Sequence, residues 1–314
     1  ESNSRQQKHE LAAQSTFKYF GDVHPLTSIT KSNNPDQEEG GLVLSKISGN
    51  PNFINENKGH NFARAHTLLH LKSNSVCTWI PKNSCSTLRY SIALENGAIS
   101  GIDDLEWIHK NNLSFAASVK ELLRANYSFV ILRNPFKRLL SFYCDKLCHN
   151  TLNQNDSSYS NLKSLLGASE KTTFADFIEL LWNNPGLKEK DQHIRDQCDF
   201  LVYKNYHDYL AFEKYDQTIY TIREKTGIIL EDIRSKNSIY TTLNCDGSDD
   251  FDYNMPSKSV GSLMLNAKKP LVERMYNKEL IRKAGTLYFN DILLYLNTID
   301  SGEAELHYWL KFLN

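Results

Sequence analysis

The sequence predicts an α/β fold in which helices flank a central, mostly parallel sheet and the C-terminal part is helical. Residues 76–92 and residues 128–147 each begin with a short apolar run, break at polar residues and continue with helical spacing of apolar residues. Such strand-turn-helix units are typical of parallel sheets, whose strands are buried on both faces. Beyond residue 270, the apolar residues recur mainly at helical spacing.

The composition bounds the class of protein. The chain has 314 residues, 40% of them hydrophobic, which is enough for a sizeable core. Its 36 Lys and Arg residues nearly balance its 37 Asp and Glu residues, so no global basic excess points to nucleic acid. No apolar run reaches the roughly 18 residues that a membrane span needs. We predict a single domain over residues 60–314, preceded by a polar, partly irregular arm over residues 1–59.

The first strand-turn-helix unit contains a turn suited to a phosphate-like anion. The apolar run Val76–Ile80 stops at Pro81, and a helical pattern resumes at Leu88. A loop of small residues that leads into a helix can aim several backbone N–H groups at one anion, with the positive end of the helix dipole behind them. Lys82 adds a positive charge. Hydroxyl groups come from Ser84, Ser86 and Thr87.

This turn differs from the Walker loop of nucleoside triphosphatases. The G-x-x-x-x-G-K-[ST] pattern is absent, the turn has no glycine, and Lys82 precedes the small residues. Taken alone, the stretch also fits a tight turn with a solvated lysine. A second signal is therefore needed before a function can be assigned.

The second strand-turn-helix unit repeats this design. A buried-type strand over residues 128–132 leads directly into Arg133, Asn134 and Pro135, and a helical pattern begins at Phe136. An arginine at the carboxyl end of a strand can donate two hydrogen bonds to phosphate oxygens. Ser141, further along the helix, adds a hydroxyl group.

The two turns resemble the cofactor motifs of sulfotransferases that use 3′-phosphoadenosine 5′-phosphosulfate (PAPS), especially the Golgi-type carbohydrate branch, sulfotransferase family 2. Residues 81–89 are similar to the phosphosulfate-binding loop of that family. Residues 133–146, which end in Cys144, Asp145 and Lys146, are similar to its second motif, an Arg-x-Pro-x-x-Arg-Leu-x-Ser-x-Tyr pattern that binds the 3′-phosphate. Tyr288 and Asp291 resemble its terminal Tyr-x-x-Asp pattern, so the resemblance covers about residues 70–298.

The resemblance implies a P-loop-like sulfotransferase fold and an activity. The enzyme would move the sulfuryl group of PAPS to a hydroxyl of a carbohydrate or similar polar acceptor, by in-line displacement and without a metal. Lys82 would be catalytic by stabilising charge on the leaving oxygen. The implied cofactor-binding residues are Pro81, Lys82, Asn83, Ser84, Cys85, Ser86, Thr87, Arg133 and Ser141.

Three residues are candidates for the base that removes the acceptor's proton. His109 is the first, because related enzymes often use a histidine or glutamate between the two motifs and it is the only histidine there. His193 is the second. It lies in a segment that resembles the family but departs from it at Ile194 and Asp196. Glu106 is the third. A surface histidine without a catalytic role is the alternative for His109.

Histidines and cysteines do not predict a metal site. A predicted helix over residues 60–71 contains His60, His66 and His70, but no cysteine or carboxylate cluster completes a ligand set. Cys144 and Cys148 share one face of the second unit's helix, where two thiols are more often packing residues. Six cysteines are too few for a disulfide scaffold at this length.

The remaining elements follow from local pattern. Helices are predicted over residues 119–123, 174–182, 216–226, 271–283 and 286–296, and a strand is predicted over residues 209–215. Two polar loops, over residues 149–171 and 244–259, are expected to decide which acceptor is used.

Two other functions stay open from the sequence. One is an atypical P-loop kinase, which the missing Gly-Lys-[ST] sequence disfavours. The other is a non-catalytic module on the same fold that binds an anionic glycan. The compartment also stays open: it would be the Golgi lumen for a trimmed eukaryotic enzyme and the cytoplasm for a bacterial one. The oligomeric state is not predicted.

Overall fold

The computed structural model describes residues 42–45, 54, 56–148, 163–233, 247–266 and 268–313. Most of the predicted arm, residues 1–59, lies outside these ranges, so its boundary with the domain stays a prediction. The same holds for most of the predicted acceptor loop over residues 149–171 and for the first residues of the loop over residues 244–259.

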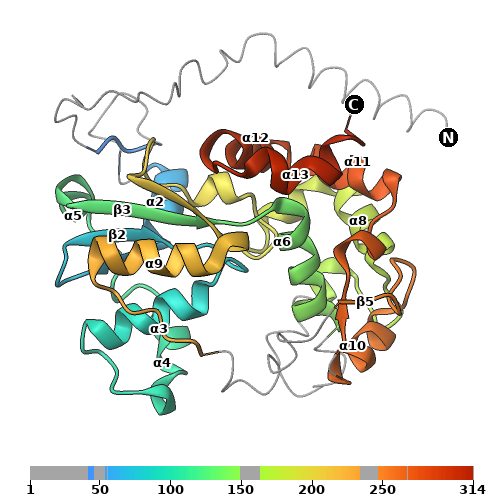
Figure 1. Cartoon of the computed structure of the whole chain (residues 1–314), viewed down its shortest axis with the longest axis horizontal. Coiled ribbons are helices and arrows are strands. Elements are labelled where there is room, and N and C mark those ends of the chain that lie inside the picture. Colours follow the sequence, from blue (N-terminus) through green and yellow to red (C-terminus); the bar gives the residue numbers. More distant parts are fainter. Residues whose placement is uncertain are drawn as a thin grey trace, which may run out of the picture. The chain divides into compact units, whose positions relative to one another are not determined.

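A four-stranded sheet forms the centre of the fold (Figure 1). The strands are β1 (Thr67–His70), β2 (Ser75–Thr78), β3 (Tyr127–Leu132) and β4 (Asp208–Ala211), and they are adjacent in that order. The edge strand β1 pairs antiparallel with β2, whereas β2 with β3 and β3 with β4 are parallel. The predicted α/β fold with a mostly parallel sheet is confirmed.

Both faces of the sheet are covered. One face contributes Cys77, Phe129 and Ile131 to a core that includes residues of α3 (Cys85–Glu95) and α9 (Tyr215–Thr226). The neighbouring positions Val76 and Val130 belong to a second core, which includes α2 (Lys58–Ala65) and the C-terminal helices. Successive strand residues point to opposite faces. The strands are therefore buried at nearly every position, including polar residues such as Thr67, Ser75 and Thr78.

Helices outside the sheet build the second half of the domain. Figure 1 shows α8 (Phe174–Asn183), α10 (Ser257–Leu265) and α11 (Lys278–Leu287) on its right-hand side. Phe136 of α6 (Pro135–Phe142) stacks on Trp309 of α13 (Gly302–Leu310) with ring centroids 4.7 Å apart. The other helices of the described residues are α4 (Trp107–Lys110), α5 (Val119–Arg124) and α12 (Phe289–Thr298). A π-helix, Tyr143–Cys148, directly continues α6.

Shorter elements complete the described part of the chain. A second sheet pairs β5 (Gly247–Ser248) with β6 (Lys269–Pro270) in parallel. The 3-10 helices are η2 (Ile102–Asp104), η5 (Pro185–Glu189), η6 (Gln197–Phe200), η7 (Phe212–Lys214) and η10 (Val272–Arg274). None of the helices in the described ranges is both long and apolar enough to cross a bilayer.

Three predicted elements need correction. The helix predicted over residues 60–71 ends at Ala65, because Thr67–His70 instead pair with β2 as the edge strand β1. The strand predicted over residues 209–215 ends at Ala211 and turns into a 3-10 helix. The helix predicted over residues 271–283 begins only at Lys278, where the side chain of Asn277 caps it. Helices α10 and α13 were not predicted.

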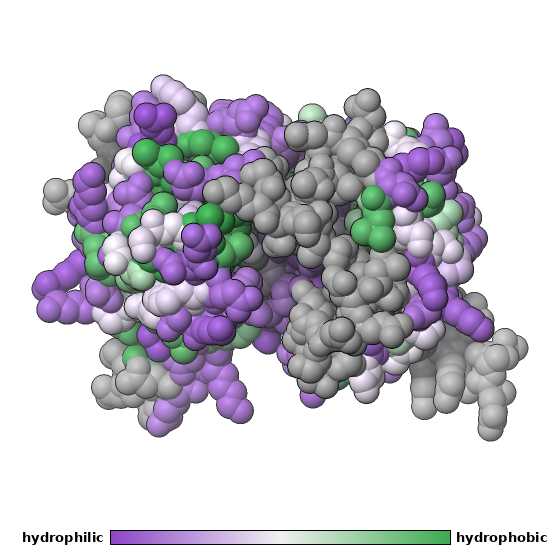
Figure 2. All heavy atoms as spheres, turned by 90° about the horizontal axis from the view of Figure 1, so that it is seen from below, coloured by the Kyte–Doolittle hydropathy of each residue, from purple (hydrophilic) through white to green (hydrophobic). Residues whose placement is uncertain are grey.

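Hydrophilic residues predominate on the molecular face that Figure 2 shows, and hydrophobic residues form small separate patches there. Scattered apolar side chains of this kind are normal on a protein surface and indicate no partner by themselves. In open parallel sheets, ligands bind at the carboxyl ends of the strands.

Candidate functional site

The two predicted anion-binding turns lie side by side. Strands β2 and β3 are parallel neighbours, so the turn Pro81–Ser84 after β2 and the turn at Arg133 after β3 emerge at the same edge of the sheet. The Arg133 guanidinium donates a hydrogen bond from Nη1 to the backbone carbonyl of Lys82 over 2.7 Å. Two motifs 51 positions apart in the sequence are thus in direct contact.

The first turn has a strained backbone that leads into an uncapped helix. Lys82 and Ser84 have φ angles of 73° and 64°, in the left-handed region that residues other than glycine rarely adopt. Such strain persists only where the surroundings enforce it, and it is common at functional sites. No side chain caps α3 at Ser84, and the first N–H groups of a helix have no partner within it. The N–H groups of Cys85, Ser86 and Thr87 are therefore suited to an anion.

A buried amide, Gln197, joins the two turns. Its Oε1 accepts hydrogen bonds from Asn83 Nδ2 over 2.6 Å and from the Arg133 N–H over 3.0 Å. Its Nε2 donates to the Arg133 carbonyl over 2.9 Å. Asn83 Nδ2 also donates to the carbonyl of Ile131, so the Asn83 side chain fixes the turn from inside the protein. The Asn83 backbone N–H donates to the Ile80 carbonyl over 3.1 Å, so this buried residue shapes the turn from within.

Two buried charges fix the backbone around these turns. Arg138 donates from Nε to the Pro81 carbonyl over 3.1 Å, and Asp291 accepts from the Gln197 N–H over 2.8 Å. Burial raises the pKa of the Asp291 carboxyl, and the nearby charge of Asp196 raises it further. Burial lowers the pKa of Arg138, while the charge of Asp291 opposes that effect. These buried groups act on the main chain of the site.

The other predicted cofactor residues are spread around the turn. The Ser84 hydroxyl lies 2.9 Å from the Tyr215 hydroxyl, and the Thr87 side chain is buried. Cys85 and Ser86 are partly exposed, with Cys85 Sγ and Ser86 Oγ 4.0 Å apart. Ser141 is partly exposed on α6. The structure thus places all of them on the turn, on α3 or on α6.

Arg133 is held by contacts on several sides. Its guanidinium carbon lies 4.3 Å from the centre of the Phe212 ring, a cation–π contact. Burial lowers the pKa of Arg133 to about 10, and the charge of Glu213 opposes the shift. The group is charged near neutral pH. Its buried Nε has no hydrogen-bond partner among the described residues, so one donor remains for a ligand.

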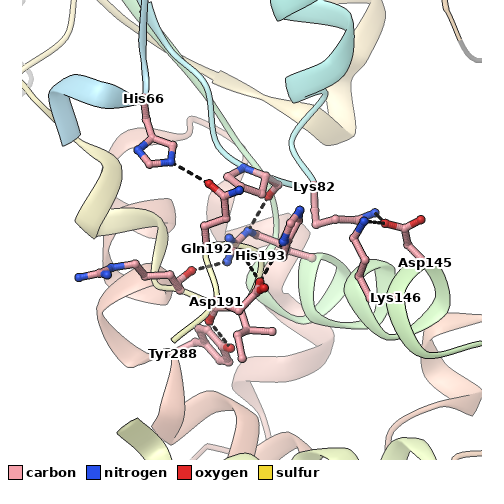
Figure 3. Close-up of polar contacts among 12 residues, drawn as sticks. His66, Lys82, Asp145, Lys146, Asp191, Gln192, His193 and Tyr288 are labelled. Carbon is pink, nitrogen blue, oxygen red and sulfur yellow. Dashed lines mark hydrogen bonds and ion pairs between the residues drawn. The ribbon is translucent and has the colours of Figure 1, made fainter. Parts of the chain in front are cut away.

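The side chain of Lys82 belongs to a cluster of three charges (Figure 3). Asp145 Oδ2 lies 3.0 Å from Lys82 Nζ and 3.2 Å from Lys146 Nζ. The three side chains are only 10 to 17% exposed. Burial raises the pKa of Asp145, but the positive charges of Lys82 and Lys146 outweigh burial and lower the pKa well below its usual range. Asp145 is therefore ionised near neutral pH.

His193 and Asp191 form a second polar pair beside Lys82 (Figure 3). Asp191 Oδ1 accepts from the His193 backbone N–H over 2.7 Å and lies 2.9 Å from His193 Nδ1. A carboxylate at Nδ1 fixes the tautomer with Nδ1 protonated and Nε2 able to accept a proton. Burial lowers the pKa of His193, and Asp191 partly opposes that shift. The imidazole is therefore neutral near pH 7.

The other two base candidates are more exposed. His109 lies exposed on α4; partial burial lowers its pKa, and the positive charges of Arg89 and Lys146 lower it further. It thus faces the same cationic region, but within the described residues no hydrogen bond orients its ring. Glu106 forms a largely exposed ion pair with Lys110 over 3.4 Å. An exposed pair of this kind contributes little to binding or stability.

A cavity of about 550 Å³ opens next to these groups. It lies between the end of β2 and the loop that follows α4, and its lining consists of Ala65, His66, Trp79, Lys110, Asn111, Asn112, Leu113, Ser114 and Gln192. His66 Nε2 and Gln192 Oε1 are 3.0 Å apart, and Gln192 precedes His193 in the chain. Trp79 stands two residues before Pro81. The cavity therefore borders both the turn and the His193 segment.

Sequence reasoning missed three residues that organise this site: Gln197, Asp145 and Lys146. The first was noted only as part of a family-like segment, and the other two only as the end of the second motif. In the described part of the chain, no group of three or more His, Cys, Asp or Glu side chains could hold a metal ion. The cluster around Lys82 is instead built for anions.

Comparison with known proteins gives one match. A family model described as "Sulfotransferase family" matches residues 75–296, a range that includes β2, both turns, His193 and Asp291. No curated protein and no solved structure matches the chain.

We predict that Gln197→Leu destabilises the fold and loosens both turns. The change leaves the buried Asn83 amide and the Arg133 N–H without their acceptor, and each such loss costs about 1–3 kcal/mol. Chemical denaturation should show a free energy of unfolding lower by roughly 2–4 kcal/mol. The exposed Gln217→Leu on α9 is the control and should stay within about 0.5 kcal/mol of the parent. Equal stability of the two variants would contradict the assigned role of Gln197.

Proposed function

The chain belongs to the sulfotransferase family, and we propose that it transfers the sulfuryl group of PAPS to a hydroxyl group of a carbohydrate or similar polar acceptor. The contact between Arg133 and Lys82 carries the proposal. PAPS bears a phosphosulfate at one end of its ribose and a 3′-phosphate on the other side. Two adjacent anion-suited turns match one such molecule, whereas a single turn would fit any phosphate.

The residues present fit this donor. The uncapped start of α3 offers backbone N–H groups to the phosphosulfate, and Lys82 offers a positive charge. Arg133, whose buried Nε has no hydrogen-bond partner among the described residues, is suited to the 3′-phosphate. Ser141, on the helix α6 that follows Arg133, adds a hydroxyl group. The donor supplies the sulfuryl group and leaves as adenosine 3′,5′-bisphosphate. The protein supplies the charges that hold it.

The reaction needs an in-line displacement and a base. The acceptor oxygen bonds to sulfur as the bond from sulfur to the 5′-phosphate oxygen breaks. Lys82 stabilises the negative charge that gathers on that leaving oxygen. The acceptor's proton passes to a base within hydrogen-bond reach. The site holds the donor and the acceptor in line, and this lowers the entropic cost of bringing them together for the reaction.

We assign the base to His193 ahead of His109. Asp191 orients the His193 ring through Nδ1 and leaves Nε2 to accept a proton. The lowered pKa keeps the imidazole neutral, and therefore basic, at pH 7. His109 remains the second candidate because it faces the same cationic region from α4. Glu106 is the third, and its largely exposed ion pair with Lys110 argues least for it.

The cavity beside Trp79 is our proposed acceptor site. It is lined by aromatic and amide side chains, and it borders the segment that carries His193. The amide groups of Asn111, Asn112 and Gln192 can both donate to and accept from hydroxyl groups, whereas the buried Trp79 ring supports the wall from behind. A mostly apolar pocket with a few placed polar groups is the usual form of a small-molecule site.

Two other functions are less well supported. A P-loop kinase would need a glycine-rich loop ending in Gly-Lys-[ST], whereas this turn has no glycine and reaches its shape through left-handed Lys82 and Ser84. A glycan-binding module without activity would share the family's fold. Measured sulfuryl transfer decides between that module and an enzyme.

Changes at Lys82 and Arg133 should separate catalysis from donor binding. Isothermal titration should show that the parent protein binds adenosine 3′,5′-bisphosphate without magnesium. Arg133→Ala should weaken this binding roughly 10- to 100-fold, because a hydrogen bond to a charged group contributes about 1.5–3 kcal/mol. Lys82→Ala should lower kcat for transfer from labelled PAPS roughly 100-fold or more, with a smaller loss of binding. Lys137→Ala, on the same helix as Ser141, is the control.

A parent protein that does not bind this nucleotide would defeat the proposal. Magnesium-dependent ATP binding in its place would favour the kinase. Nucleotide binding without transfer to any of a panel of sugar, phenol and steroid acceptors would favour the non-catalytic module. Circular dichroism of each variant shows whether a loss reflects unfolding.

The pH profile should identify His193 as the base. The neutral imidazole is the active form, so kcat should fall as the pH drops through the pKa of His193, with a midpoint below 6.5. Asp191 raises this pKa, so Asp191→Asn should move the midpoint to still lower pH while reducing kcat on the plateau. His193→Ala should lower kcat and abolish the fall of kcat at acidic pH. If His109→Ala abolishes it instead, the base is His109.

Filling the cavity should affect the acceptor and leave the donor unaffected. Asn112 is exposed on the cavity wall, and Asn112→Trp places a large ring there. We expect the KM for the acceptor to rise roughly tenfold or more, because the new ring would block acceptor contacts. A loss of about 1.4 kcal/mol of binding free energy corresponds to a factor of ten. Affinity for adenosine 3′,5′-bisphosphate should not change. Asn290→Trp, exposed on α12, is the control. An unchanged acceptor KM would show that the acceptor binds elsewhere.

A further inference from the structure

Asp145 lies in an uncommon element. The π-helix Tyr143–Cys148 directly follows α6, and π-helical turns are rare and frequent at functional sites. Its neighbours Tyr143, Cys144 and Cys148 are buried in the larger core. Asp145 and Lys146 are the charged residues of this π-helix. The Asp145 carboxylate forms ion pairs with both Lys82 and Lys146.

The geometry places two ammonium groups on one carboxylate oxygen. Lys82 Nζ and Lys146 Nζ lie 3.0 Å and 3.2 Å from the same Asp145 Oδ2, and Figure 3 shows both side chains ending at this carboxylate. Two like charges this close repel each other, and their attraction to an opposite charge between them offsets that repulsion. Asp145 therefore permits Lys146 to stay next to Lys82.

A role in stability alone explains this cluster poorly. Burying charged groups costs free energy, and a buried ion pair is often no more stabilising than apolar side chains of similar size. The three groups together carry a net charge of +1. The charge of Lys146 also reaches His193 and His109, whose pKa it lowers after the larger effect of burial. Lys146 thus acts electrostatically on the region assigned to the reaction.

We infer that Asp145 is a positioning residue for Lys82 and Lys146, and that Lys146 supplies a second positive charge where the sulfuryl group is transferred. This inference rests on the proposed function. Charge that gathers on the leaving oxygen is then opposed by two oriented ammonium groups. Fixed charges of this kind need no rearrangement at the moment of reaction, which is what makes them effective.

The test compares Asp145→Asn and Lys146→Gln with the parent protein. We expect Asp145→Asn to lower kcat for transfer from labelled PAPS at least tenfold. Its affinity for adenosine 3′,5′-bisphosphate should stay equal or rise, because a negative charge near the nucleotide is lost. A merely structural residue would instead lower affinity and thermal stability together. Lys146→Gln should lower kcat at least tenfold, and Lys146→Arg should restore most of it.

A matched control comes from a second half-buried ion pair. Glu305→Gln breaks the pair between Lys137 and Glu305, whose nitrogen and oxygen are 3.7 Å apart, and it should leave kcat unchanged. Full activity of both Asp145→Asn and Lys146→Gln, with an active parent, would overturn this inference and leave the proposed function standing. An inactive parent that also fails to bind the nucleotide would overturn both. If Asp145→Asn does not fold, Lys146→Gln and Lys146→Arg decide the outcome.

Discussion

The parallel pairing of β2 with β3 is the constraint on which the site depends. Cys77 lies opposite Phe129 and Thr78 opposite Val130, so both strands run toward the same edge of the sheet. The chain must turn at this edge twice, once before α3 and once before α6. Two helix starts and two basic side chains are thereby brought to one place, although they are far apart in the sequence. Arg133 then reaches the Lys82 carbonyl without any loop having to bridge the distance.

A buried polar layer beneath the turns maintains their strained backbone. The left-handed conformations of Lys82 and Ser84 each cost about 1–3 kcal/mol, and the surrounding contacts have to offset this. Gln197, Asn83 and Arg138 bond to backbone groups of the turns from inside the protein. The main chain of Lys82 is itself held by the Arg133 guanidinium, which donates to the Lys82 carbonyl. Its side chain extends to the other side, where it meets Asp145.

The sequence predicted the elements whose pattern is local and regular. Apolar runs marked β2 and β3, and helical spacing marked α3 and α6, so the position of Lys82 and Arg133 at one edge followed from the fold class. The edge strand β1 was missed because its four residues include a histidine and follow α2 closely. Gln197 and Asp145 were missed as site residues because their partners lie 63 to 114 positions away. Local hydrophobic periodicity predicts neither such distant contacts nor a π-helix.

The division of the proposed site explains why its donor side follows from the sequence more directly than its acceptor side. The proposed donor side is built from strand ends and helix starts, which secondary-structure rules place together. The proposed acceptor side combines α2, the loop after α4 and the segment of Gln192, which no sheet pairing joins. The contact between His66 and Gln192 links two of these pieces, and the next residue is His193. A change in this irregular wall would therefore alter the proposed acceptor site and the orientation of His193 together, while the proposed donor site would keep its geometry.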